Sequence, residues 1–127
     1  MPKPPTRYPW LAKFYVAFRG IGFGVRGQSS FHVHFVFAVL VSLLAVVLHC
    51  DAIEWCLLLG CIGLVLTVEL VNSMVETLFR GLDEATKERT WPCLDIAAGA
   101  VLVASFTAAV IGAIIFVPKL AVWFGVH

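Results

Sequence analysis

Four polar residues stand close together in an otherwise apolar stretch of the chain: Glu69, Asn72, Ser73 and Glu76. On a helix with about 100° per residue they fall within roughly 100° of one another, which predicts a single polar stripe. The two carboxylates would lie about 10 Å apart along the helix axis, too far to share one proton. The spacing therefore predicts two carboxylates with separate roles rather than a coupled pair.

Acidic side chains in an apolar helix need a reason, because ionisable groups inside a membrane are costly and usually mark a functional site. Glu76 could form an ordinary helix ion pair with Arg80, four residues on. Asp95 could stabilise a helix N-terminus, and Asn72 could hydrogen-bond a neighbouring helix. Glu69 has no Lys or Arg within reach on its own helix, so a purely structural role explains it least well.

The composition indicates a membrane protein. The 127 residues form a single predicted domain, 1–127, and are 61% hydrophobic and 13% charged, with a mean hydropathy of +0.95. Soluble domains are about half apolar and a quarter charged, so this balance favours a bilayer environment. The net charge of +1 argues against nucleic acid as a partner.

Three stretches are long and apolar enough to cross about 30 Å of hydrocarbon as helices: 31–49, 55–79 and 93–118. The period-2 alternation of barrel strands is absent, so the predicted fold class is an all-α membrane protein. Residues 1–30 carry five Lys or Arg and no acid, whereas the loop after the first span carries two acids and no Lys or Arg. The positive-inside rule therefore predicts a cytoplasmic N-terminus, with residues 1–30 cytoplasmic or interfacial, in the inner (plasma) membrane.

Residues 8–27 predict an amphipathic surface helix in the cytoplasmic interface. Trp10, Phe14 and Phe18 recur at steps of four on one side, and Arg19 lies on another. Glycines are frequent between residues 20 and 27, so we expect the helix to weaken there.

Two further patterns concern contacts between helices. Small residues recur at steps of four in the third span: Ala100, Ala104, Ala108 and Gly112. Such a seam lets another helix approach closely, although it could also face lipid. Three helices shield several polar groups poorly, so we expect a homo-oligomer. His32 and His34 are interpreted as interfacial residues with satisfied hydrogen bonds rather than as metal ligands.

The chain resembles the prokaryotic diacylglycerol kinase family of small membrane-embedded lipid kinases. The sequence "ELVNSMVE" fits the family signature E-x-x-N-[ST]-x-x-E, and "DIAAGAVL", which begins at Asp95, fits a second conserved block. The segment "AFRGIGFGVRGQSSFHVHFVFA" resembles the first block. The short matches "IEW" and "IGAIIFVPKL" resemble the undecaprenol kinase branch in particular.

This resemblance implies a homotrimer of three membrane helices and one surface helix per chain. It implies transfer of the ATP γ-phosphate to a lipid alcohol, undecaprenol or diacylglycerol, at the cytoplasmic face, with Mg²⁺ bound to the nucleotide. By position, Glu69 would be the general base and Glu76 a magnesium ligand, with Gln28 at a second metal position. The residues that would bind nucleotide or organise the site are Asn72, Ser73, Arg80, Asp95 and Arg19.

The chain departs from the family pattern at three positions. Gln28 replaces a metal-binding Glu, Leu94 replaces a phosphate-binding Lys, and Arg80 replaces an Asp. With Leu94 in place of Lys, the chain lacks a charge-assisted contact to phosphate that contributes about 1.5–3 kcal/mol. We hypothesise that Arg80, which shares the stripe of Glu76, supplies the positive charge that Leu94 lacks.

Two other function classes remain open at this point. The chain could be a catalytically degenerate relative that binds lipid or nucleotide without turnover, and the residues at 28 and 94 are the reason to consider it. It could also be a small membrane scaffold or a transporter-like subunit whose acids serve helix association or proton movement. Broken spans and internal repeats would favour transport, and the sequence contains neither.

Overall fold

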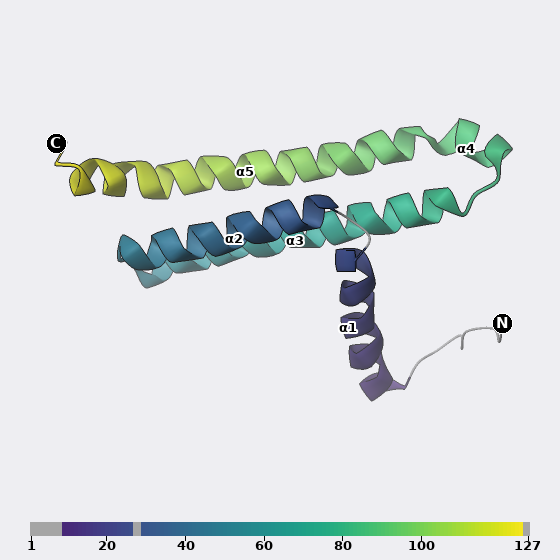
Figure 1. Cartoon of the computed structure of the whole chain (residues 1–127), viewed down its shortest axis with the longest axis horizontal. Helices are drawn as coiled ribbons and strands as arrows, with labels where there is room; N and C mark the ends of the chain where they lie inside the picture. The colour runs from purple at the N-terminus through teal and green to yellow at the C-terminus, as the bar shows by residue number, and fades with distance from the viewer. Residues whose placement is uncertain (1–8, 27–28, 126–127) are drawn as a thin grey trace.

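The protein is described by a computed structural model over residues 9–26 and 29–125, and this part of the chain is all α-helical, as predicted. The helices are α1 (Trp10–Arg26), α2 (Ser29–Val47), α3 (Ala52–Arg80), α4 (Glu84–Thr90) and α5 (Pro92–Trp123). Figure 1 shows α2, α3 and α5 running side by side along the long axis, with α1 lying across that direction. The short helix α4 lies at the turn between α3 and α5.

Three of the described helices, α2, α3 and α5, are long and apolar enough to cross a membrane, as the hydropathy pattern predicted. Most of their large apolar side chains are exposed in the single chain, so these surfaces are available to lipid or to other copies of the protein. The chain is therefore a membrane protein, with its polar stripe on the middle helix of the three.

The turn between α2 and α3 is closely defined by the sequence. α2 ends at Val47, two residues before the predicted end of the span, and His49 has a positive φ of 54°. Asp51 caps α3: its carboxylate accepts a hydrogen bond from the Glu54 amide at 2.8 Å, and the Glu54 carboxylate accepts one from the Asp51 amide at 3.2 Å. This reciprocal pair is a capping box, which fixes where α3 starts.

The same end of the molecule holds the apolar core and an ion pair between helices. The core consists of Ala45, Leu48, Leu58, Ile115 and Phe116. Lys119 Nζ lies 3.0 Å from Glu54 Oε2, and this ion pair joins α5 to α3. These contacts hold α3 and α5 antiparallel in a fixed register, and that register sets which residues lie opposite the polar stripe.

Helix α1 continues further than the sequence predicted. It runs without interruption to Arg26, so the expected weakening from residue 20 onward is wrong for the described residues. The reason lies in tertiary packing: a Cβ built on Gly24 would lie only 2.5 Å from Leu70 Cδ2. Glycine thus allows α1 to approach α3 closely, and this contact outweighs the low helix propensity of the segment.

Candidate active site

The predicted polar stripe is largely buried. Glu69, Asn72 and Ser73 on α3 are 1%, 7% and 5% exposed, and they are the buried polar residues of the described chain. The side chain of Glu69 is the largest of those that are almost fully buried there. Burying a carboxylate is expensive unless hydrogen bonds compensate, so its partners decide what it can do.

Glu69 contacts two polar side chains of α2. The Ser30 hydroxyl donates a hydrogen bond to Glu69 Oε1 at 2.6 Å, and His34 Nε2 lies 3.5 Å from Glu69 Oε2. Glu69 lies about as far along α3 from the α2–α3 turn as Ser30 lies from that turn along α2, so the two helices bring Glu69 beside the first turns of α2. Each carboxylate oxygen therefore has a partner from the neighbouring helix.

Asn72 and Glu76 form a second pair, one helical turn further along α3. Asn72 Nδ2 donates a hydrogen bond to Glu76 Oε1 at 3.0 Å. The amide oxygen of Asn72 is buried and accepts no hydrogen bond within the described chain. A carboxylate beside a free amide oxygen is a donor set that suits Mg²⁺, which takes one or two protein oxygens together with phosphate and water oxygens. The residues present therefore fit a magnesium–nucleotide ligand.

Two buried hydroxyls accompany these pairs. Ser73 Oγ on α3 and Ser105 Oγ on α5 have no hydrogen-bond partner among residues 9–26 and 29–125. Buried hydroxyls are normally paired, so each is a candidate contact for a group that the single chain does not supply.

The other predicted site residues are more dispersed. Arg80 Nη2 donates a hydrogen bond to Thr77 Oγ1 at 3.2 Å. Asp95 is exposed in the first turn of α5, and Arg19 is exposed on α1, where its guanidinium lies 5.8 Å from the centre of the Tyr15 ring. Gln28 lies outside the described residues.

The described residues form no group of three or more His, Cys, Asp or Glu side chains that could hold a metal by themselves. Any bound metal would then take most of its ligands from elsewhere, as Mg²⁺ does when it binds with a nucleotide. Glu69 and the Asn72–Glu76 pair have different hydrogen-bond partners, so the stripe has two distinct ends.

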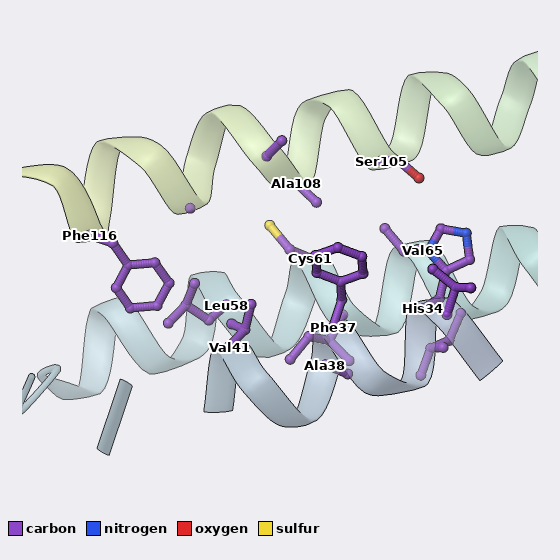
Figure 2. A pocket seen from close by; sticks show the side chains of 15 residues that line it. His34, Phe37, Ala38, Val41, Leu58, Cys61, Val65, Ser105, Ala108 and Phe116 are labelled. Atoms are coloured by element: carbon purple, nitrogen blue, oxygen red, sulfur yellow. The ribbon is translucent and has the colours of Figure 1, made fainter. Parts of the chain in front are cut away.

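An apolar pocket of about 440 Å³ is lined in part by His34, the residue that contacts Glu69. α2, α3 and α5 line it, almost entirely with apolar side chains. Figure 2 shows Phe116 at one end and His34, Val65 and the Ser105 hydroxyl at the other. Since His34 also contacts Glu69, the polar end of the pocket adjoins the buried carboxylate. This arrangement suits a long hydrocarbon chain that ends in a hydroxyl.

Sequence reasoning missed the contribution of α2 to this site. The sequence does not single out Ser30, and it predicts His34 only as an interfacial residue. Their spacing of four residues places them on one face of a helix, and that signal could have identified them as a pair. The sequence contains no signal that this face lies against Glu69, because that depends on the register between α2 and α3.

Comparisons with known proteins identify the family of the chain. Residues 15–116 match the family described as prokaryotic diacylglycerol kinase. A diacylglycerol kinase of Synechocystis sp. is 30% identical over 125 residues, which cover 93% of this chain and 71% of the relative. An undecaprenol kinase of Bacillus subtilis is 30% identical over 114 residues, which cover 87% and 93% respectively. No solved structure matches the chain significantly.

Proposed function

Because the chain belongs to the prokaryotic diacylglycerol kinase family and is a lipid kinase, we propose that it transfers the γ-phosphate of ATP to the hydroxyl of a membrane lipid alcohol. The acceptor is undecaprenol or diacylglycerol, and the short matches near residues 53–55 and 111–120 favour undecaprenol. The observation that supports this most strongly is a carboxylate that is 1% exposed, beside the polar end of an apolar pocket.

Glu69 is the proton acceptor in this proposal. The lipid chain occupies the apolar pocket, and its hydroxyl lies at the end where His34 and Ser105 are found. As the hydroxyl oxygen bonds to the γ-phosphorus, its proton moves to a carboxylate oxygen of Glu69, and ADP leaves. Proton transfer to a positioned base of this kind contributes about 10²–10⁴-fold to the rate.

Glu76 and Asn72 hold the metal side of the site. Glu76 would hold a Mg²⁺ bound with ATP, which would neutralise the negative charge of the phosphate oxygens. The Asn72 amide holds the Glu76 carboxylate through the 3.0 Å hydrogen bond, which fixes one ligand before the nucleotide arrives. Gln28 is the second proposed ligand. Its amide oxygen brings no charge, so we expect a lower metal affinity than a second carboxylate would give.

Arg80 supplies the positive charge that a Lys at position 94 would bring. It lies on α3 one turn beyond Glu76, and its guanidinium donates a hydrogen bond to the Thr77 hydroxyl. Asp95 and Arg19 contribute to nucleotide binding from α5 and α1, and Ser73 contributes through its buried hydroxyl. These roles are proposed from position and exposure.

The proposed assembly is a homotrimer in the inner (plasma) membrane, with the N-terminus in the cytoplasm. The exposed apolar faces of α2, α3 and α5 support association of copies within the bilayer. The Lys and Arg residues of 1–30 support the orientation, which brings the Glu76 and Arg80 end of the stripe toward cytoplasmic ATP.

A direct experiment tests the function. Purified protein in detergent receives labelled ATP, Mg²⁺ and either undecaprenol or diacylglycerol, and lipid phosphate is measured with Glu69→Gln as control. Product from one lipid that disappears in the variant supports the proposal and identifies the acceptor. Nucleotide binding without product would instead support the degenerate alternative. Absence of both would support a scaffold.

A further inference from the structure

The most buried polar side chain of the described protein is an acid that must be ionised before it can accept a proton. Glu69 is 1% exposed, in the middle of an apolar helix. An apolar environment favours the neutral acid unless donors stabilise the charge. Whatever donates to this carboxylate therefore determines whether it is ready to act as a base.

Both polar contacts of Glu69 come from one face of α2. Ser30 and His34 are four residues apart, which is about one helical turn, and each contacts a different oxygen of Glu69. The Ser30 hydroxyl donates to Oε1 at 2.6 Å, a short distance that is typical of a hydrogen bond from a hydroxyl to an ionised carboxylate. His34 Nε2 lies 3.5 Å from Oε2. Two contacts from adjacent turns restrict both the rotation and the position of the carboxylate.

We infer that His34, together with Ser30, is a positioning residue that stabilises the negative charge of the Glu69 carboxylate and holds it in a single orientation beside the lipid pocket. The inference rests on the proposed function only in taking Glu69 as the base. His34 Nε2 lies 3.5 Å from Glu69 Oε2, close enough for a hydrogen on this nitrogen to stabilise the negative charge of the carboxylate. The alternative interpretation, in which His34 only fills an interfacial position, does not account for its contact with a side chain 1% exposed.

The position of His34 also connects the base to the acceptor. Its side chain is 20% exposed and lines the apolar pocket, whereas Glu69 is almost wholly enclosed. Figure 2 shows the imidazole at the same end of the pocket as Ser105. In the reaction the proton passes from the lipid hydroxyl to Glu69, while Ser30 and His34 form and break no covalent bond. Their contribution is made before the proton moves.

The chain provides a matched control two residues away. His32 lies on α2 as well, but it is exposed, and no contact with Glu69 is recorded for it in the described structure. A helix places residues two apart on different faces, so the same substitution at the two positions separates a local contact from a general loss of a histidine.

The test measures the chemical reactivity of the Glu69 carboxyl group without relying on turnover. Dicyclohexylcarbodiimide modifies buried carboxyl groups in their protonated form, and mass spectrometry of the Glu69 peptide gives the rate at constant neutral pH. His34→Leu removes the donor at similar volume, and we expect modification at least tenfold faster than in the wild type. His34→Gln retains a nitrogen donor, and His32→Leu leaves the contact intact, so both should stay within about twofold of the wild type.

A second variant and a kinetic measurement complete the test. Ser30→Ala, at an exposed position that tolerates a smaller side chain, should also accelerate the modification. In the kinase assay His34→Leu should lower kcat at least tenfold with an unchanged KM for ATP, and His34→Gln should restore most of it. The inference is overturned if His34→Leu is modified at the wild-type rate, or if His34→Gln reacts as fast as His34→Leu.

The two proposals fail separately. If the modification rates follow the expected order but no lipid is phosphorylated, the positioning role stands and the kinase proposal falls. If lipid phosphate forms and the His34 variants leave the Glu69 modification unchanged, the positioning role falls and the kinase proposal stands.

Discussion

The hydrogen bond from Asn72 to Glu76 allows the effect of one substitution to be worked out from the structure. Asn72 Nδ2 lies 3.0 Å from Glu76 Oε1, and Asn72 is 7% exposed, so solvent cannot readily replace the donor. A hydrogen bond to a charged group contributes about 1.5–3 kcal/mol. Each 1.4 kcal/mol corresponds to about a factor of ten, so Asn72→Leu should lower kcat/KM for magnesium–ATP about 10–100-fold.

The assay measures initial rates of lipid phosphate formation at saturating lipid alcohol with magnesium–ATP varied. The KM for the lipid should not change, because the Asn72–Glu76 pair lies away from the pocket lining. Met74→Leu, an exposed and nearly volume-conserving change on the same helix, should behave like the wild type. A wild-type kcat/KM for Asn72→Leu, or an equal loss in Met74→Leu, would refute the reasoning.

Three further predictions concern the remainder of the chain. Arg80→Ala should raise the KM for ATP about tenfold through loss of a charge-assisted phosphate contact, and an unchanged KM would exclude compensation for the missing Lys. A Cβ added at Gly22 has no atom within 4 Å, so Gly22→Ala should stabilise the protein by about 0.5–1 kcal/mol in thermal unfolding. A Cβ added at Gly24 would clash with Leu70, so Gly24→Ala should not show this stabilisation. Equal Tm values for the two variants would contradict the packing of α1 on α3. Hydrogen bonds that the Asp83 carboxylate accepts from Thr86 lower the pKa of Asp83. The Asp83 cap of α4 therefore persists at neutral pH and is lost only in acid below the ordinary pKa range of Asp. The chemical shift of the capped amide should titrate with a midpoint below that range, and a midpoint above it would show that the cap is absent.

Hydropathy and helical periodicity predict most of the fold. Continuous apolar stretches favour spanning helices whatever the tertiary contacts, so the three long helices could be assigned from the sequence alone. The capping box at Asp51 and Glu54 fixes where α3 begins through local contacts. α1 was predicted less well, because the packing of Gly24 on Leu70 is a tertiary contact that no propensity contains.

Part of the candidate site could likewise be predicted from the sequence, and part could not. The period of 3.6 residues put Glu69, Asn72 and Ser73 on one face, and their burial in the folded chain agrees with a shared stripe. The partners of that stripe were not predictable. Which turn of α2 meets Glu69 depends on the length of the turn at His49 and on the packing register, and neither follows from the spacing of Ser30 and His34.

The central claim is that Glu69 takes the proton of the lipid hydroxyl, and its most direct test is kcat for lipid phosphate formation by Glu69→Gln. Glu54→Gln is the matched control, because it makes the same change on the same helix at the far end, where the acid pairs with Lys119. We expect a loss of at least 100-fold for Glu69→Gln and a near wild-type rate for the control. A Glu69→Gln enzyme that retains a rate within a few-fold of the wild type would contradict it.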